Sequence, residues 1–214
     1  LLASLSGEHL CPDGKTITFA DDEIANLPPD QRRQWGLAFV PEERLGRGAV
    51  PGMSLTENAL LPGFLNGLVR TGLTAETQAE AFADEIIDQY KVKAAGRHAL
   101  ADSLSGGNLQ KFIIGREIMQ NPKILIAAPP TWGVDLGAAT AIHKALITLR
   151  DQGAAILVVS EDIDELFLIS DRIGAICNGA LSPIKPTPES SIQELGRMMA
   201  GDFNQSVNNG STAL

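Results

Sequence analysis

The sequence predicts an α/β fold built on a parallel sheet, and the pattern of its second half carries that prediction. Two short apolar segments, residues 123–128 and 154–160, are separated by a helical pattern at residues 137–149. That helix brings four apolar residues to one face: Ala139, Ile142, Leu146 and Leu149. Continuous apolar strands that alternate with helices are typical of parallel βαβ units whose sheet is covered on both faces. We therefore expect both strands to be buried.

The rest of residues 105–200 fits the same α/β core. Further helices are predicted at residues 106–120, around residues 162–170 and at residues 190–201, and a third strand at residues 171–177. The polar tail, residues 201–214, is expected to be disordered because it has too little apolar surface to bury.

Residues 1–53 are expected to form a partial β region. Short strands are predicted at residues 15–19 and 36–40. Pro28 and Pro29 open a helical turn between them, since the fixed φ of proline suits a helix start.

A helical subdomain is predicted for residues 54–104. It opens with a capping box, in which the side chains of Ser54 and Glu57 each satisfy the other residue's backbone N–H. A second helix is predicted over residues 74–92, where apolar residues recur at helical spacing. These are Ala75, Ala79, Phe82, Ile86 and Tyr90.

Composition excludes several classes of function. A net charge of −9 argues against a nucleic-acid surface, which needs clustered lysine and arginine. No segment reaches about 18 consecutive apolar residues, so no membrane span is predicted. His9, His98 and His143 lie in no cluster of metal ligands, and no metal site is predicted. The chain begins without methionine, as if within a domain, which leads us to expect a fragment of a longer protein.

The stretch DSLSGGN, residues 102–108, has the chemistry of an anion site. Ser105 offers a hydroxyl, and the helix that starts beside it offers free N–H groups and the positive end of its dipole. Gly106 and Gly107 lack the Cβ atoms that would keep a phosphate away from the backbone. The alternative is that Ser105 caps its own helix and binds nothing. For these three residues alone, the simpler interpretation is favoured.

Several motifs together resemble an ATP-binding cassette (ABC) ATPase from its Q-loop to its C-terminus. LSGGN at residues 104–108 corresponds to the signature motif, and ILIAAPP at residues 124–130 to Walker B. GVD at residues 133–135 corresponds to the D-loop, and VVSED at residues 158–162 to the switch region. The Q-loop lies within FVPEERLGRGAVPGMSLTENALL, residues 39–61.

The resemblance covers roughly residues 7–200 and is more specific than the family alone. The chain looks like the second half of the tandem ATPase subunits of bacterial nucleoside and simple-sugar importers. It therefore implies a P-loop NTPase-like α/β domain with an inserted helical subdomain. The phosphate-binding Walker A motif of such a domain would precede Leu1.

The chain departs from the family pattern at the positions that act on a domain's own nucleotide. Ala128 and Pro129 stand where Walker B has two carboxylates, one for Mg²⁺ and one that orients the attacking water. Glu161 replaces the switch histidine, and its charge would repel a γ-phosphate. Glu42 stands at the Q-loop glutamine. The resemblance thus implies a degenerate own site, with no catalytic residue and no metal in this chain.

The motif that such a domain presents to its neighbour is intact. ABC ATPases bind ATP between two cassettes, one of which contributes the signature. The residues implied to contact ATP held by the first cassette of the same polypeptide are Ser105, Gly106, Gly107 and Asn108. Asp135 matches the D-loop aspartate, which would cross the interface, and it also suits the N-cap of the helix at residues 137–149. Trp132 is either an interface residue or a covering aromatic.

The resemblance implies an importer subunit that couples ATP binding and hydrolysis to transport. Expected partners are the first cassette, membrane permease subunits and, indirectly, a substrate-binding protein, with no nucleic acid. The expected location is the cytoplasmic side of the bacterial inner membrane, with Glu42 and residues 43–53 against the permease. ATP and Mg²⁺ would serve the intact subunit. Neither is expected to bind this chain tightly, and the chain alone is expected to be inactive.

Two other classes of protein stay open. One is a non-catalytic binding module that regulates a transporter, and the other is a soluble ABC-type protein outside transport. The second would show basic patches and would normally keep its Walker B carboxylates. A free-standing hydrolase of doubly wound type would need a nucleophile elbow or a phosphate loop, and the sequence has neither.

Overall fold

The computed structural model describes residues 1–11, 17–63, 69–70, 73–74 and 76–203. The chain divides into two compact units, Leu1–Val159 and a second that begins at Ser160. The subdomain boundaries expected at residues 53, 104 and 200 stay predictions. From residue 204 on, the tail that we expect to be disordered lies outside the described residues.

A parallel sheet organises the first unit. Its described strands are β3 (Leu37–Val40), β6 (Ile124–Ala127) and β7 (Ala155–Val158), with β6 in the middle. Parallel neighbours need a crossover connection, and helix α6 (Leu136–Asp151) provides the one between β6 and β7. The predicted parallel βαβ arrangement is confirmed.

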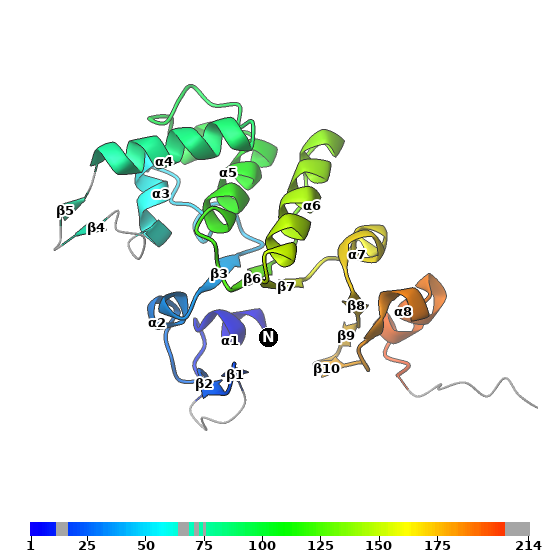
Figure 1. The fold of residues 1–214 in the computed structure, drawn as a ribbon. Helices are drawn as coiled ribbons and strands as arrows, with labels where there is room; N and C mark the ends of the chain where they lie inside the picture. The colour runs from blue at the N-terminus through cyan, green and yellow to red at the C-terminus, as the bar shows by residue number, and fades with distance from the viewer. Residues whose placement is uncertain (12–16, 64–68, 71–72, 75, 204–214) are drawn as a thin grey trace, which may run out of the picture. The chain divides into compact units, whose positions relative to one another are not determined.

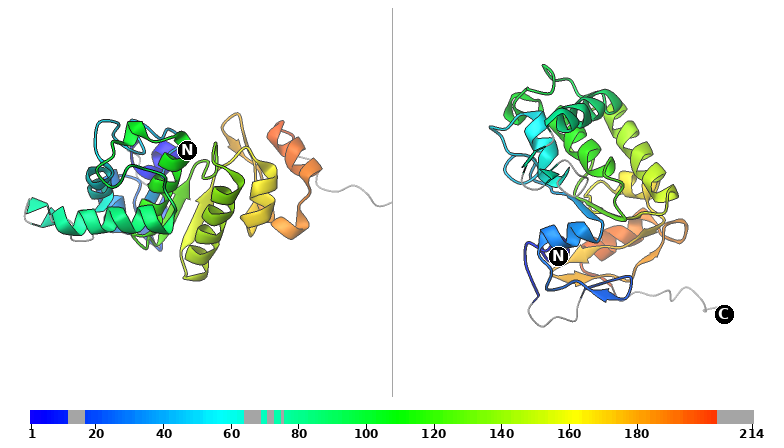
Figure 2. Two further views of the ribbon diagram at one scale, coloured as in Figure 1. Left: turned by 90° about the horizontal axis from the view of Figure 1, so that it is seen from above. Right: turned by 60° about the vertical axis from the view of Figure 1, so that its left-hand side comes forward.

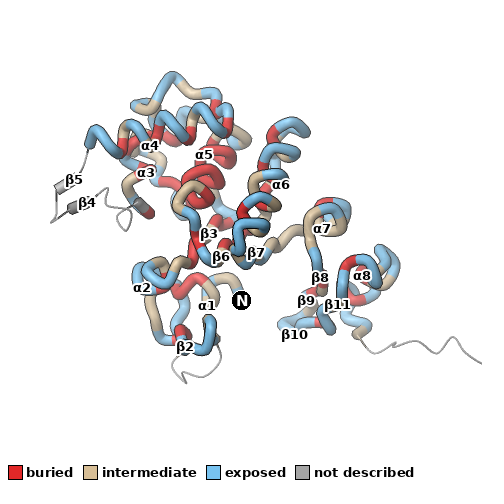
Figure 3. Tube along the Cα trace, viewed as in Figure 1, coloured by how far each residue is buried: buried red, intermediate tan, exposed pale blue. Residues whose placement is uncertain are grey.

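Helix α5 (Gly106–Ile118) is the central helix of this unit. It contacts β3, α6 and helix α4 (Glu76–Gln89). Figures 1 and 2 show α5 and α6 side by side on one side of the strands. Every residue from Leu109 to Ile118 is buried, which Figure 3 shows as an almost continuous red stretch. A helix buried on all sides belongs to the interior of a domain.

The predicted capping box is confirmed at the start of α3 (Leu55–Gly63). The backbone N–H of Ser54 donates to Glu57 Oε2 over 2.7 Å, and the backbone N–H of Glu57 donates to Ser54 Oγ over 3.2 Å. Because the Glu57 carboxylate accepts bonds from the backbone and side chain of Ser54, its pKa is lowered. A local sequence pattern is sufficient to start this helix.

The segment between α3 and α4 is not entirely helical. It contains two-residue strands, β4 (Val69–Arg70) and β5 (Leu73–Thr74), which pair antiparallel. Helix α4 buries Ala79 and Ile86 as predicted. A short 3₁₀ turn, Ala101–Ser103, then leads into α5.

The N-terminal segment forms helix α1 (Leu2–Ser6), strands β1 (Thr18–Phe19) and β2 (Asp22–Glu23), and helix α2 (Pro29–Gln34). The pattern did not predict α1 or β2. Arg32 is buried and ties α1 to α2, since its guanidinium donates to the carbonyl of Leu5 over 2.8 Å and to that of Ala25 over 3.0 Å.

The second unit has a small core of its own. Its elements are α7 (Ile163–Ile169), β8 (Arg172–Ile173), β9 (Ile176–Cys177), β10 (Ala180–Leu181), β11 (Lys185–Pro186), a 3₁₀ turn (Thr187–Glu189) and α8 (Ile192–Met199). Ile173, Leu195 and Met198 are buried together. The described helices of the chain include none that is long and apolar enough to cross a membrane.

The single strand predicted at residues 171–177 is wrong. The segment forms β8 and β9, which pair antiparallel with β11 and β10. The two are separated at Gly174 and Ala175, where the Ala175 N–H donates to the Ser182 hydroxyl over 2.9 Å. A side chain here takes the N–H that a continuous strand would use in its ladder.

Strand β7 is less buried than predicted. Leu157 is 39% exposed, and every β7 residue is exposed or intermediate. Among the described residues, β7 pairs with β6 at one edge only. In contrast, Leu125 in the middle strand β6 is fully buried, as predicted.

Candidate functional site

The carboxyl ends of β3 and β6 bring the Q-loop and Walker B positions together. Glu42 lies two residues beyond β3, and Ala128 and Pro129 follow β6 directly. The backbone N–H of Ala128 donates to the carbonyl of Val40 over 3.0 Å, so the two loops leave the sheet side by side. Ligands of open α/β sheets bind at this edge.

In the signature loop, residues 105–108, the side chain of the serine makes no hydrogen bond to the backbone of the helix that follows. Ser105 occupies the N-cap of α5, yet its hydroxyl makes no capping hydrogen bond. It accepts a bond from Asn108 Nδ2 over 2.9 Å, while Asn108 Oδ1 accepts one from the Lys93 N–H over 2.9 Å. Ser105 is exposed. Its hydroxyl proton therefore remains available to an outside acceptor. Ser105 thus occupies the N-cap without a capping hydrogen bond, and its contact with a phosphate stays a prediction.

Both glycines of the signature loop are closely packed against the protein. A Cβ at Gly106 would lie 2.7 Å from Arg44 Nη1, and one at Gly107 would lie 3.2 Å from the Gly133 carbonyl oxygen. Any side chain at Gly106 would displace the guanidinium. These contacts place the D-loop, residues 133–135, directly against the signature loop.

Asp135 caps α6 as predicted. Its Oδ1 accepts a bond from the Ala138 N–H over 2.9 Å, and this bond is the largest cause of the lowered pKa of the carboxyl group. Two large apolar residues flank it on the surface: Trp132 is 65% exposed and Leu136 is 84% exposed. The predicted role of Asp135 across an interface stays a prediction.

Arg44, which sequence reasoning did not single out, joins the loops of the site. Its Nε donates to Gln110 Oε1 over 3.0 Å, and its Nη2 donates to the Trp132 carbonyl. The guanidinium carbon lies 5.3 Å from the centre of the Trp132 ring, within the range of a cation–π contact. Gln110 in turn donates to the carbonyls of Pro129 over 3.3 Å and Pro130 over 3.0 Å.

Gln110 is a second residue of this cluster that the motifs do not indicate. It is 1% exposed, within a buried run of α5 that also contains Lys111, Arg116 and Glu117. A buried amide needs partners, so its position alone indicates a polar contact. Nothing local in the sequence indicates Arg44, because its partners lie 66 and 88 residues away.

Arg116 ties α5 to the helical block and to the glycine-rich loop at residues 43–53. Its Nη1 donates to the Asn58 carbonyl over 3.1 Å, and its Nη2 donates to the Gly48 carbonyl over 2.8 Å. Glu117 pairs with it over 2.9 Å and with Arg33 over 2.9 Å. Arg116 and Glu117 are buried, so removal of the Glu117 carboxylate would leave the Arg116 guanidinium in the core without its counter-charge.

Known structures share this arrangement of elements. The dimeric structure of MJ0796, a bacterial ABC transporter cassette, gives a TM-score of 0.72 at 20% identity and covers 87% of this chain and 78% of that chain. A structure of the ATP-binding subunit of an ABC transporter gives 0.69 at 18% identity, with 86% and 76% covered. The chain has the fold of an ATP-binding cassette.

The cassette is also related in sequence to ATP-binding subunits of importers. The nucleoside import ATP-binding protein NupA of Lactococcus lactis subsp. cremoris is 38% identical over 190 residues, which are 88% of this chain and 38% of the relative. The guanosine import ATP-binding protein NupO of Bacillus subtilis is 38% identical over 190 residues, 88% and 37% of the two chains. The galactose/methyl galactoside import ATP-binding protein MglA of Escherichia coli is 33% identical over 183 residues, 86% and 36%.

The cassette therefore spans less than two fifths of the length of these curated relatives. No family model matches it.

The Walker B position of this cassette does not fit Mg²⁺. Ala128 is 2% exposed and carries no donor atom, and Pro129 has no side-chain acceptor. Mg²⁺ is held by carboxylate and other oxygen ligands. Within the described ranges, no group of three or more histidine, cysteine, aspartate or glutamate side chains could hold a metal ion.

The switch position lies in the second unit of the cassette. Glu161 is exposed and precedes Asp162, which caps α7 by accepting a bond from the Glu165 N–H over 3.0 Å. The Ser160 hydroxyl donates to Glu165 Oε2 over 2.8 Å. These bonds order the backbone around Glu161. An ionised carboxylate only accepts hydrogen bonds, so Glu161 cannot replace a histidine as a donor.

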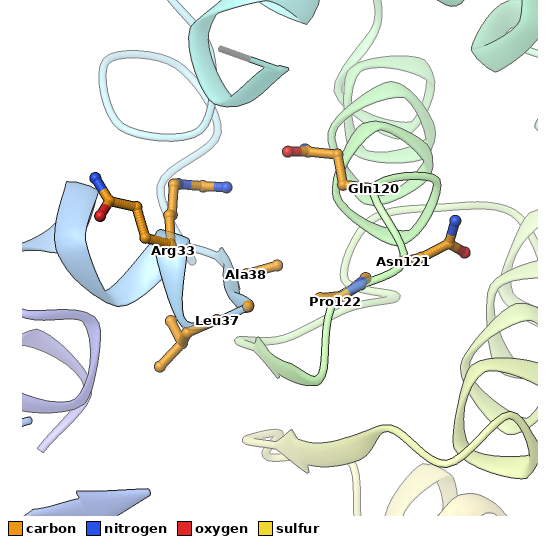
Figure 4. A pocket seen from close by; sticks show the side chains of 8 residues that line it. Arg33, Leu37, Ala38, Gln120, Asn121 and Pro122 are labelled. Carbon is orange, nitrogen blue, oxygen red and sulfur yellow. The ribbon is translucent and has the colours of Figure 1, made fainter. Parts of the chain in front are cut away.

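A pocket of about 330 Å³ in the first unit lies away from these loops. Arg33, Leu37 and Ala38 line one side, and Gln120, Asn121 and Pro122 line the other (Figure 4). These residues precede or begin β3 and β6, so the pocket lies at the amino ends of the strands. It is not part of the candidate nucleotide site, which lies at the carboxyl ends.

Proposed function

We propose that this cassette is one half of the ATP-hydrolysing machinery of an importer for nucleosides or simple sugars. It supplies the signature loop to ATP held by another cassette of the same polypeptide, while its own nucleotide site is degenerate. The names of the relatives, which import nucleosides, guanosine or galactosides, support this class of cargo.

The observation that carries the proposal is the contrast between the signature loop, residues 105–108, and the Walker B position, Ala128 and Pro129. The hydroxyl of Ser105 is exposed and does not cap α5, although the loop around it is ordered by Asn108. The Walker B position has lost its carboxylates. The Ser105 hydroxyl and the N–H groups of Gly106 and Gly107 would hold the γ-phosphate, since a helix N-terminus favours an anion. Bound ATP would supply the energy for transport.

The exposure of β7 supports the view that this cassette is completed by further chain. Strand β7 ends the described sheet, pairs only with β6 there, and leaves Leu157 39% exposed. A further parallel strand beside β7 would pair with its other edge and make it an interior strand of the sheet. We place there the strand that leads into the Walker A motif.

The contact with the permease would lie at Glu42 and residues 43–53, on the cytoplasmic side of the bacterial inner membrane. Arg116 supports this assignment, because it links the Gly48 carbonyl of that loop to α5, the helix that carries the signature. A displacement of the loop by the permease would thus be transmitted to the signature helix. The substrate-binding protein would act only indirectly.

Replacing Gly106 by aspartate in the intact transporter subunit tests the proposal. The side chain would meet the Arg44 guanidinium and add a negative charge to the loop that is proposed to hold the phosphate. We therefore expect ATP turnover to fall by about 100-fold or more. Steady-state phosphate release measures the effect.

The matched control changes the switch position of the degenerate site. Glu161 is exposed, and Glu161→His should leave the turnover of the competent site within about twofold of the wild type, because this position does not face its ATP. Near-normal turnover of the Gly106→Asp subunit would contradict the proposal and favour a regulatory binding module.

A further inference from the structure

We propose that Arg44 is a positioning residue that holds the signature loop and the D-loop in a single fixed arrangement. It follows β3, far in sequence from both loops, and it contacts each of them. The catalytic consequence of this role rests on the proposed function of the signature loop. The positioning itself rests on contacts within the cassette.

Three nitrogen atoms of one guanidinium meet three parts of the site. Nε donates to the side chain of Gln110, in the first turns of α5. Nη2 donates to the backbone carbonyl of Trp132, immediately before the D-loop. Nη1 lies 2.7 Å from the position that a Cβ of Gly106 would occupy. The guanidinium carbon lies over the Trp132 ring, 5.3 Å from its centre.

Asn108 orders the signature loop and Asp135 caps the helix after the D-loop, but these bonds do not hold the two loops against each other. Gly106, Gly107 and Gly133 provide no side chains, and Gly133 has a φ of +65° that other residues rarely adopt. Glycine raises the conformational freedom of a loop. A site whose groups must be held within about 0.5 Å of their working positions needs support from neighbouring side chains. Arg44 provides that support from outside both loops.

The geometry requires arginine and not simply a positive charge. The planar guanidinium offers donors in fixed directions and a flat face for stacking, whereas a lysine ammonium is a single point charge on a flexible stem. Lysine could reach Gln110 or the Trp132 carbonyl, but it could not also stack on the ring. The second anchor, Gln110, is fixed by the carbonyls of Pro129 and Pro130. The loop at Pro129 and Pro130, which has no carboxylate, thus holds the side chain of Gln110 in place.

Amide hydrogen exchange in the intact, nucleotide-free subunit tests the positioning directly. Two amides report on the two loops: Leu109 donates to the Ser105 carbonyl over 2.9 Å, and Val134 donates to the Thr131 carbonyl over 3.2 Å. In Arg44→Met, both amides should exchange at least about fivefold faster, the change expected when one net hydrogen bond is lost. Arg44→Lys should restore neither amide fully.

The matched control is Arg47→Met on the same loop. Arg47 pairs with Glu8 and has no contact with the signature loop among its described bonds. Exchange at Leu109 and Val134 should remain as in the wild type in this variant. Unchanged exchange at both amides in Arg44→Met, or full protection in Arg44→Lys, would overturn the proposal.

Kinetics of the same variants connect the positioning to ATP turnover. If the signature acts on ATP held elsewhere, Arg44→Met should lower kcat at least about tenfold and change KM for ATP by less than about threefold, since another domain binds the nucleotide. Gly106→Asp, measured in parallel, separates the positioning role of Arg44 from the proposed function of the signature loop. Loss of turnover in Gly106→Asp with normal kcat in Arg44→Met would overturn the role of Arg44 alone. Faster exchange in Arg44→Met with normal turnover in Gly106→Asp would overturn the proposed function and leave the positioning intact.

Discussion

Ser54 and Glu57 hold the start of α3 through reciprocal hydrogen bonds. Ser54→Ala removes the hydroxyl that accepts the Glu57 N–H, and loss of such a cap costs about 1 kcal/mol. We expect this loss in the free energy of unfolding at neutral pH, measured by urea denaturation. Thr148→Ala, in the exposed face of α6, is the control and should be neutral or slightly stabilising, because alanine favours a helix.

The effect of Ser54→Ala should depend on pH. The folded pKa of Glu57 is lower than its unfolded value, near 4.3. The stabilisation from the carboxylate is therefore complete above pH 4.3 and is lost as the pH falls through the folded pKa. The difference between wild type and variant should shrink in that acidic range. A difference that grows on acidification would contradict the assignment.

Residues with local roles could be predicted from the sequence, and residues with distant partners could not. The capping pair and the N-cap at Asp135 depend on neighbours three positions away. Arg44 depends on Gln110 and on the Trp132 carbonyl, which the fold alone brings near. Sequence spacing indicates the first kind of contact because a helix start fixes the geometry in advance.

Helix α5 packs against the end of α4 with no room for another carbon atom. A Cβ at Gly115 would lie 2.5 Å from Cδ2 of Tyr90, whose burial raises its pKa to about 12. Gly115→Ala should therefore destabilise the first unit by about 1–3 kcal/mol, despite the better helix propensity of alanine. Thermal and urea unfolding measure the change.

Gly196→Ala in α8 is the matched control for this change. Its Cβ would meet nothing within 4 Å, so the substitution should be neutral or stabilising by up to about 1 kcal/mol. If Gly115→Ala is as stable as Gly196→Ala, the two helices are less tightly packed than the structure indicates.

At the scale of elements, continuous apolar patterns predicted the structure better than interrupted ones. Strand β6 and helix α6 match the expected ranges closely because each buries a continuous pattern. The expected strand at residues 171–177 divides into β8 and β9, since a serine seven residues beyond Ala175 interrupts its ladder. No pattern within the strand itself could reveal that bond.

At the scale of the whole molecule, the proposal depends on the contrast between LSGGN at residues 104–108 and the expected Walker B position at Ala128 and Pro129, which has no carboxylate. The sequence predicts this contrast because motifs are local, and the structure adds that the Ser105 hydroxyl makes no capping hydrogen bond. The sequence could not predict the exposure of β7, because that exposure depends on which elements lie beside the strand. The account thus requires a second cassette, whose ATP the signature loop contacts.

Vanadate-dependent photocleavage of the intact subunit tests that requirement most directly. Vanadate trapped with Mg-ADP occupies the γ-phosphate position, and ultraviolet light then cuts the chain beside it. If the signature loop contacts ATP of another cassette, a cut is expected within residues 105–108, and it should disappear when the phosphate-loop lysine of that cassette is replaced. A cut at that phosphate loop with none in residues 105–108 would contradict it.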